Sequence, residues 1–144
     1  MYLLDTNILS ETRKIRTGKA NQSVIDWLAD TPEHLLYVNA VVLMEVERGI
    51  FAKERKDPQQ GEVLRQWFEH VVKPTFAERT FVVDENTARI CAKLHIPDHA
   101  PENDAWVAAS AIQHNLVLVT RNTDDFARTD RKSTRLNSSH EIPS

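Results

Sequence analysis

The chain is poor in cysteine, in long apolar runs and in the features of a secretion signal. Its one cysteine, Cys91, cannot form an internal disulfide and argues against a metal site built from thiolates. No apolar stretch approaches the ~20 residues that a membrane-spanning helix needs, and no basic segment precedes the first apolar residues. The 144 residues are enough for one domain with a hydrophobic core. We therefore expect a single globular domain in the cytoplasm.

Positive charge is also scarce, since 18 lysines and arginines stand against 21 aspartates and glutamates. The resulting net charge of −3 gives no general indication of a nucleic-acid partner. If this protein binds RNA, metal ions and local basic patches must offset the repulsion between an acidic chain and the phosphates. Four histidines to which we assign no ligand role are scattered along the sequence: His34, His70, His95 and His99.

Short apolar segments alternate with segments of helical periodicity along the chain. Strands are expected at residues 2–4, 35–38, 80–83 and 116–119. Helices are expected at about residues 6–14, 24–28, 40–53, 58–73, 85–94 and 103–112, with Asn39 and Asp84 as caps and Pro74 as a stop. This alternation predicts an α/β fold with a central parallel sheet of four to five strands, covered by helices on both faces. Sites in such sheets form at the carboxyl ends of the strands.

The apolar pattern stops after Phe126, and we assign the domain to residues 1–129. Residues 130–144 contain the string DRKSTRLNSSH, which resembles the translation of a common sequencing-adaptor oligonucleotide. We therefore expect a disordered tail that is foreign to the natural protein, in place of a native last strand. The alternative is a native but disordered polar terminus.

Acidic or amide side chains occur at four places beside the expected strands. Asp5 comes directly after the first strand, and Glu45 lies within the apolar helix that follows the second. Asp104 falls in the first turn of an alanine-rich helix, and Asn122 and Asp125 follow the last strand. Each has an ordinary structural alternative. Asp5 and Asp104 could cap a helix or interact with its dipole. Glu45 could lie on a polar stripe of its helix, and Asn122 and Asp125 could form a turn.

The four places together are more informative than any one of them. A parallel sheet could bring all of them to one edge, because the carboxyl ends of its strands lie together. Several oxygen ligands with few histidines suit Mg²⁺ or Mn²⁺ better than zinc. Such a site could lower the pKa of a bound water, orient that water, and neutralise charge on a phosphate during in-line displacement.

These places lie in segments that resemble the PIN-domain family, in particular the VapC toxins of bacterial VapBC toxin–antitoxin pairs and the related FitB-like proteins. The resemblance runs from Met1 to about Arg128. The matching segments are YLLDTNILSE at residues 2–11, VLMEVERGI at 42–50, DAWVAASA at 104–111, LVLVTRN at 116–122 and the pair Asp125–Phe126.

The resemblance implies a PIN-like α/β/α sandwich and a metal-dependent endoribonuclease that acts as the toxin of its pair. By match with the family's motifs, Asp5 and Asp104 are the principal Mg²⁺ ligands, and Glu45 is the third acid, which binds directly or through water. Thr6 and Thr120 would orient Asp5 and the reacting water through hydroxyl hydrogen bonds.

One departure from the family concerns the fourth acidic position. Many members carry an aspartate where this chain has Asn122, whose neutral amide can still accept from a water or coordinate through its oxygen. Asp125, or as a second choice Asp124, is expected to supply part of that role. Arg13, Lys14 and Arg16 follow the first motif and form a candidate patch for RNA phosphates, with a solvated helix end as the alternative.

The resemblance also implies partners. They are an RNA substrate, a VapB-type antitoxin whose C-terminal segment would lie in the active-site groove, a second copy in a homodimer, and DNA bound only through the antitoxin complex; no membrane is implied.

Two other functions stay open. A phosphatase of haloacid dehalogenase type also places an aspartate after its first strand, but it needs a second one where this chain has Asn7. A catalytically silent binding module is the other alternative, and the three intact acids argue against it.

Overall fold

One sheet, with every ladder parallel, organises the protein. The computed structural model describes residues 1–120 and 139–141. The strand order is β3-β2-β1-β4-β5, so β1 lies in the centre, between β2 and β4. Chain order reverses between β1 and β4, and ligand sites form at such switch points. The strands are β1 Tyr2–Leu4, β2 Leu36–Asn39, β3 Thr80–Phe81, β4 Val117–Thr120 and β5 Ser139–Glu141.

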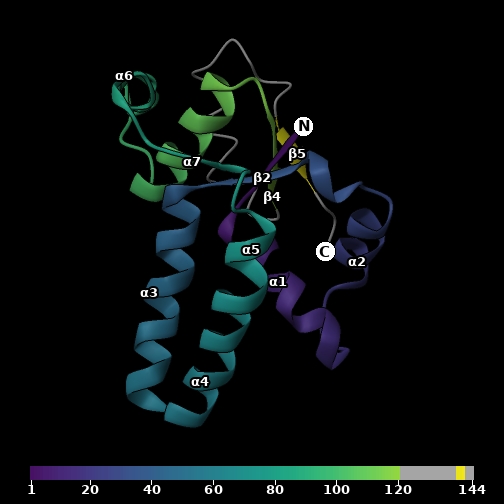
Figure 1. Cartoon of the computed structure of the whole chain (residues 1–144). Helices are drawn as coiled ribbons and strands as arrows, with labels where there is room; N and C mark the ends of the chain where they lie inside the picture. Colours follow the sequence, from purple (N-terminus) through teal and green to yellow (C-terminus); the bar gives the residue numbers. More distant parts are fainter. Residues whose placement is uncertain (121–138, 142–144) are drawn as a thin grey trace.

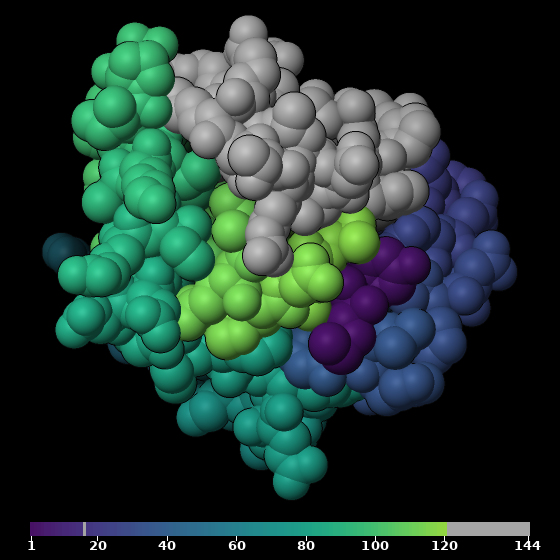
Figure 2. Space-filling view, turned by 90° about the horizontal axis from the view of Figure 1, so that it is seen from above, coloured from purple at the N-terminus to yellow at the C-terminus, as the bar shows by residue number. Residues whose placement is uncertain are grey.

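Helices form the connections and cover the sheet on both sides. Figure 1 shows α1 and α2 on one side and α6 and α7 on the other. In Figure 2, seen from above, the teal-green surface of α6 and the indigo surface of α2 lie on opposite sides of the molecule. The helices are α1 Thr6–Lys14, α2 Gln22–Ala29, α3 Ala40–Lys56, α4 Pro58–Trp67, α5 Lys73–Thr75, α6 Glu85–Leu94 and α7 Glu102–Gln113, with short turns η1 Ile15–Thr17, η2 Glu33–Leu35 and η3 Phe68–Val72. The predicted α/β class with a parallel sheet is confirmed. Within the described residues, no helix combines the length and hydropathy needed to cross a membrane.

The core lies on both faces of the central strands. Four side chains are completely buried and Leu118 of β4 is nearly so; the four are Leu3 and Leu4 of β1, Val38 of β2 and Val119 of β4. Strands covered on both faces are apolar throughout, which explains why these segments lack the polar alternation of a half-exposed sheet. Burial of each such side chain contributes about 1.5–3 kcal/mol. The core therefore fixes the strand ends from which the site is built.

Most element boundaries lie within a few residues of those expected from the sequence, and two of the differences have a clear physical reason. The third strand ends at Phe81, because Val82 and Val83 are exposed and pair with no neighbour among the described residues. Pro74 does not end its helix, which passes from α4 through the π-type turn η3 into α5. Proline cannot donate a backbone hydrogen bond, and a widened turn accommodates that loss without breaking the helix.

Three residues of the segment 130–144 also differ from the disordered structure that the sequence predicts for it. Ser139–Glu141 pair with Leu118–Thr120 as β5, so these three are not the unpaired segment expected from the sequence. The physical reason is that β4 would otherwise present an open edge of backbone donors and acceptors, which an extended segment can satisfy. The domain limit at residue 129 and the foreign origin of residues 130–144 stay predictions.

The helix pair α3–α4 is held together closely along its length, and Figure 1 shows it projecting past the sheet. A Cβ at Gly61 would lie 2.5 Å from the Cα of Glu54, so only glycine permits this approach of the two helices. Arg65 of α4 pairs with Glu47 at 2.6 Å and with Glu54 at 3.1 Å. These contacts make α3 part of a braced pair of helices.

Asn39 joins the two helices that carry predicted site residues. Its Oδ1 accepts from the Val42 N–H at 2.9 Å, and its Nδ2 donates to Oγ of Ser110 in α7 at 2.9 Å. The predicted cap on α3 is thereby confirmed. Asn39 and Ser110 are both completely buried, so water cannot replace either partner. Asn39 therefore sets the start of α3 against the middle of α7.

We predict that Asn39→Ala lowers the free energy of unfolding by about 2–4 kcal/mol, since it removes a cap and leaves a buried hydroxyl unpaired. Asn21→Ala is the matched control: Asn21 also caps a helix through its side chain but lies at the surface side of α2 and is only part-buried, so about 1 kcal/mol is expected. Urea denaturation of both variants measures the difference. Equal losses in the two variants would show that the link to Ser110 contributes nothing.

Candidate active site

Asp5 lies at the end of the central strand and is held by three elements. Its backbone N–H donates to the Val119 carbonyl at 3.1 Å, which continues the ladder between β1 and β4. Its Oδ1 caps α1 by accepting from the Ile8 N–H at 2.9 Å, and its Oδ2 accepts from the hydroxyl of Thr120. The residue is only 5% exposed. One carboxylate is thus fixed where the central strands end and α1 begins.

Charge on Asp5 is disfavoured by its surroundings. Burial raises the pKa of this carboxyl, and the negative charge of Glu45 raises it further. Hydrogen bonds from Thr120 and the Ile8 amide lower the pKa, but they do not cancel the effect of burial. A buried carboxylate with an acidic neighbour is stabilised by a cation, and such groups concentrate at functional sites.

Glu45 comes from α3 and contacts two other helices. Its Oε1 accepts from the Thr6 hydroxyl of α1 at 2.6 Å, and its Oε2 accepts from Nδ2 of Asn103 in α7 at 3.2 Å. Arg48 lies 4.0 Å from the same Oε2, but its side chain is 66% exposed and the pair is correspondingly weak. Glu45 therefore stands where α1, α3 and α7 meet.

Asp104 follows Asn103 in the first turn of α7 and is half-buried. Because Asn103 contacts Glu45, the first turn of α7 is at the same edge of the sheet as the other two acids. Asn122 and Asp125, predicted to form the fourth position, lie outside the described residues. The structure thus brings together three of the four predicted places: the end of β1, α3 and the start of α7.

The two threonines have different partners. Thr120 donates to Asp5, as its predicted role requires. Thr6, expected to act on Asp5 or on the reacting water, donates to Glu45. The reason is positional: Thr6 is the first residue of α1, and α1 packs against α3.

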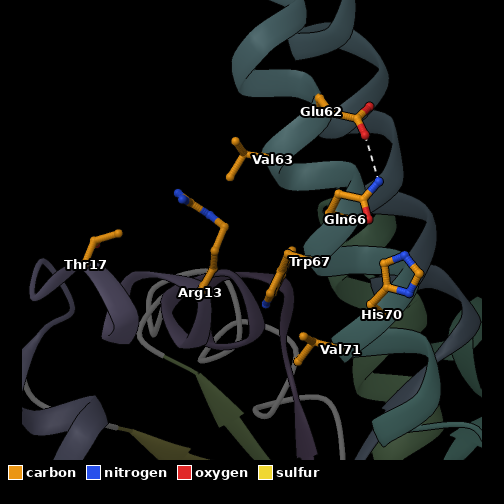
Figure 3. Close-up of a pocket in the computed structure, with 8 residues that line it drawn as sticks. All are labelled: Arg13, Thr17, Glu62, Val63, Gln66, Trp67, His70 and Val71. Atoms are coloured by element: carbon orange, nitrogen blue, oxygen red, sulfur yellow. Dashed lines mark hydrogen bonds between the residues drawn. The ribbon is translucent and has the colours of Figure 1, made fainter.

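The basic residues lie at the far end of α1. Arg13 and Lys14 are eight and nine residues beyond Asp5, which corresponds to roughly 12–14 Å along a helix axis. Lys14 pairs with Glu11 at 3.3 Å. Arg13 extends from α1 toward Val63 of α4 and lines a cavity of about 490 Å³ (Figure 3). The side chain of Arg16 lies outside the described part of the structure. Any RNA contact by Arg13 or Lys14 would therefore be distant from the acids.

A second cluster of possible ligands fits hydrogen bonding better than metal binding. One side-chain atom each of His95, His99 and Glu102 lies within 4.8 Å of the others. Nδ1 of His95 accepts from the Ala100 N–H at 3.1 Å, so a neutral ring carries its proton on Nε2. That Nε2 faces the Glu102 carboxylate at 3.8 Å. A protonated ring nitrogen cannot also bind a metal, and we assign these residues no ligand role.

Sequence reasoning missed Asn103 as a site residue and treated it only as a possible helix start. The one feature of the sequence that could have indicated a role for Asn103 in the site is its position directly before Asp104. Position alone does not reveal that its amide reaches across to α3, 58 residues earlier in the chain.

We predict that Asp5→Asn raises the thermal midpoint of the metal-free protein at pH 7.5, since it removes a buried charge and its repulsion with Glu45. The pKa of Asp5 is raised above its ordinary value of 3.8, so ionisation destabilises the fold only as the pH rises above that value. The increase in the thermal midpoint caused by Asp5→Asn should therefore become smaller as the pH falls toward 4. Melting curves in EDTA from pH 4 to 8 test this, with the exposed Asp26→Asn as the control for removal of a surface carboxylate. An unchanged or lower midpoint at pH 7.5 would contradict it.

Comparisons with known proteins identify the family to which the sequence and the fold are similar. The model of the PIN domain family matches residues 2–132. Toxin FitB of Neisseria gonorrhoeae is 31% identical over 135 residues, which cover 90% of this chain and 94% of FitB. VapC ribonuclease Y4jK of Sinorhizobium fredii is 27% identical over 131 residues, which cover 88% of this chain and 90% of that protein.

Solved structures give the same result. FitAcB from Neisseria gonorrhoeae superposes with a TM-score of 0.80 at 30% identity, covering 90% of this chain and 94% of that one. FitAB bound to an IR36 DNA fragment superposes with a TM-score of 0.78 at 29% identity, covering 90% of this chain and 91% of that one. The fold, the family match over residues 2–132 and the similarity to FitB along nearly its whole length all lead to one conclusion: this chain belongs to the PIN-domain family.

Proposed function

We propose that this protein is the toxin of a type II toxin–antitoxin pair and that it cleaves RNA as a divalent-metal-dependent endoribonuclease. The observation that carries the proposal is the convergence of Asp5, Glu45 and the first turn of α7 at one edge of the sheet. Membership in the PIN family supports it, as do relatives named toxin and ribonuclease.

The chemistry of the donor set fits a hard divalent cation. Asp5 and Glu45 offer carboxylate oxygens, and their hydrogen-bond donors are hydroxyl, amide and backbone groups without charge. Oxygen ligands of this kind suit Mg²⁺ or Mn²⁺. We propose that Asp5, Glu45 and Asp104 hold the ion. When bound, it would lower the pKa of a water and neutralise charge on the phosphate.

The chain's own residues would prepare that chemistry. Thr120 fixes the orientation of Asp5, so that this carboxylate needs little reorganisation to bind a cation. Burial around Asp5 limits competing water and strengthens the electrostatic attraction for a cation. We propose that Asn122 and Asp125 complete the site on the side of β4.

RNA contacts away from the reacting phosphate would come from the basic end of α1. We propose that Arg13, Lys14 and Arg16 bind phosphates of neighbouring nucleotides, because they lie roughly 12 Å or more from Asp5. Contacts at that distance position the substrate without taking part in the reaction.

The proposed partners follow from the charge of the site and from the relatives. A groove lined by carboxylates attracts an arginine or lysine, and we propose that a VapB-type antitoxin supplies one from its C-terminal segment. The relative FitAB is a complex bound to DNA, and we propose that this toxin reaches DNA only through its own antitoxin. We also propose a homodimer and a cytoplasmic location.

The family match leaves no support for a phosphatase of haloacid dehalogenase type. A silent binding module differs from a nuclease only by the absence of turnover, and an activity measurement separates the two.

We predict that the protein cleaves RNA with Mg²⁺ or Mn²⁺ and that EDTA stops the reaction. Asp104→Asn should reduce the rate at least about 100-fold, because it removes a ligand charge while keeping the side-chain shape. The exposed Asp26→Asn is a matched control that should retain full activity. Transfer, ribosomal and messenger RNA are each tested, with circular dichroism to show that the proteins are folded.

Cleavage that persists in the Asp104→Asn protein would indicate a contaminant or a misplaced site. A folded wild-type protein that binds RNA but cuts none of the three classes would overturn the nuclease proposal in favour of the binding module.

A further inference from the structure

Glu45 has a donor on each carboxylate oxygen, and each donor comes from a different helix. Thr6 of α1 occupies Oε1 and Asn103 of α7 occupies Oε2. The side chain of Glu45 is 21% exposed, so solvent reaches it and could have satisfied either oxygen. Protein donors on both oxygens leave the carboxylate little rotational freedom about its last bond.

The amide of Asn103 does not serve its own helix. The first turn of a helix has unpaired backbone N–H groups, which require acceptors. Asn103 directs a donor, Nδ2, away from that turn and onto α3. The N-cap of α7 is Pro101, which makes no side-chain capping bond. Stabilisation of the helix start therefore gives no reason for an amide donor at position 103.

The charge state of this donor also matters. An ammonium or guanidinium at the same place would hold Glu45 equally well but would compete with a cation for its charge. The neutral amide of Asn103 orients the carboxylate without adding to the weak pairing with the largely exposed Arg48 at 4.0 Å.

We infer that Asn103 is a positioning residue for the Glu45 carboxylate, which it holds in the orientation that receives the divalent cation. This inference rests on the proposed function, since it concerns the same metal centre. Asn103 acts only through Glu45 and touches neither the ion nor the RNA.

The test measures Mn²⁺ binding by calorimetry in the absence of RNA. Asn103→Ala should raise the dissociation constant about tenfold, the lower end of the range for residues that orient metal ligands. In a Glu45→Gln background the same substitution should change it less than about twofold, because the residue through which Asn103 acts is already altered. Asn86→Ala is the matched control, since Asn86 also lies in the first turn of a helix but is exposed.

A measurement on the wild-type protein covers the case in which Asn103→Ala does not fold. On titration with Mg²⁺, the side-chain NH₂ resonances of Asn103 should shift in the NMR spectrum, and those of Asn86 should not.

Three results would overturn the inference. Unchanged Mn²⁺ affinity in Asn103→Ala, with wild-type binding intact, removes the role of Asn103 and leaves the proposed function standing. If Asn103→Ala weakens Mn²⁺ binding equally in the wild-type and the Glu45→Gln backgrounds, Asn103 does not act through this carboxylate. Wild-type protein that binds no Mn²⁺ removes the proposed metal centre itself.

Discussion

The burial of one carboxylate at the end of the central strand is the constraint on which the site depends. Asp5 is covered by the core that stabilises β1, yet it remains part of the edge where the strands end. Its position is unfavourable for charge even with the hydrogen bonds from Thr120 and the start of α1. In the proposed function, the same burial that disfavours the charge of Asp5 would strengthen the attraction of this carboxylate for a cation. Stability and function are therefore in opposition at Asp5, as is common at active sites.

Neutral polar contacts hold the rest of the site in register with that carboxylate. Asn39 and Ser110 join α3 to α7 inside the core, and Glu45 and Asn103 join the same helices at the edge of the sheet. Neither link introduces a positive charge next to Asp5 or Glu45. The helices are thus aligned by hydrogen bonds whose directionality fixes geometry, while the negative potential of the site is preserved.

Much of this arrangement could be predicted because it follows from local rules. Apolar runs at 2–4 and 116–119 and the cap at Asn39 depend on neighbouring residues, so the parallel sheet and the start of α3 were foreseeable. The partner of Thr6 and the reach of Asn103 depend on how helices cross, which one sequence does not encode in any periodic pattern. The π-type turn before Pro74 and the pairing of β5 likewise reflect tertiary packing that overrides local preference.

The bond between Thr120 and Asp5 joins residues 115 positions apart. During synthesis, Asp5 is among the first residues to be made, while Thr120 and β4 follow 115 positions later. No earlier segment can substitute, because β4 also supplies the ladder neighbour of β1. A chain in which β4 has not yet been made therefore lacks both the hydroxyl that orients Asp5 and the strand that lies beside β1.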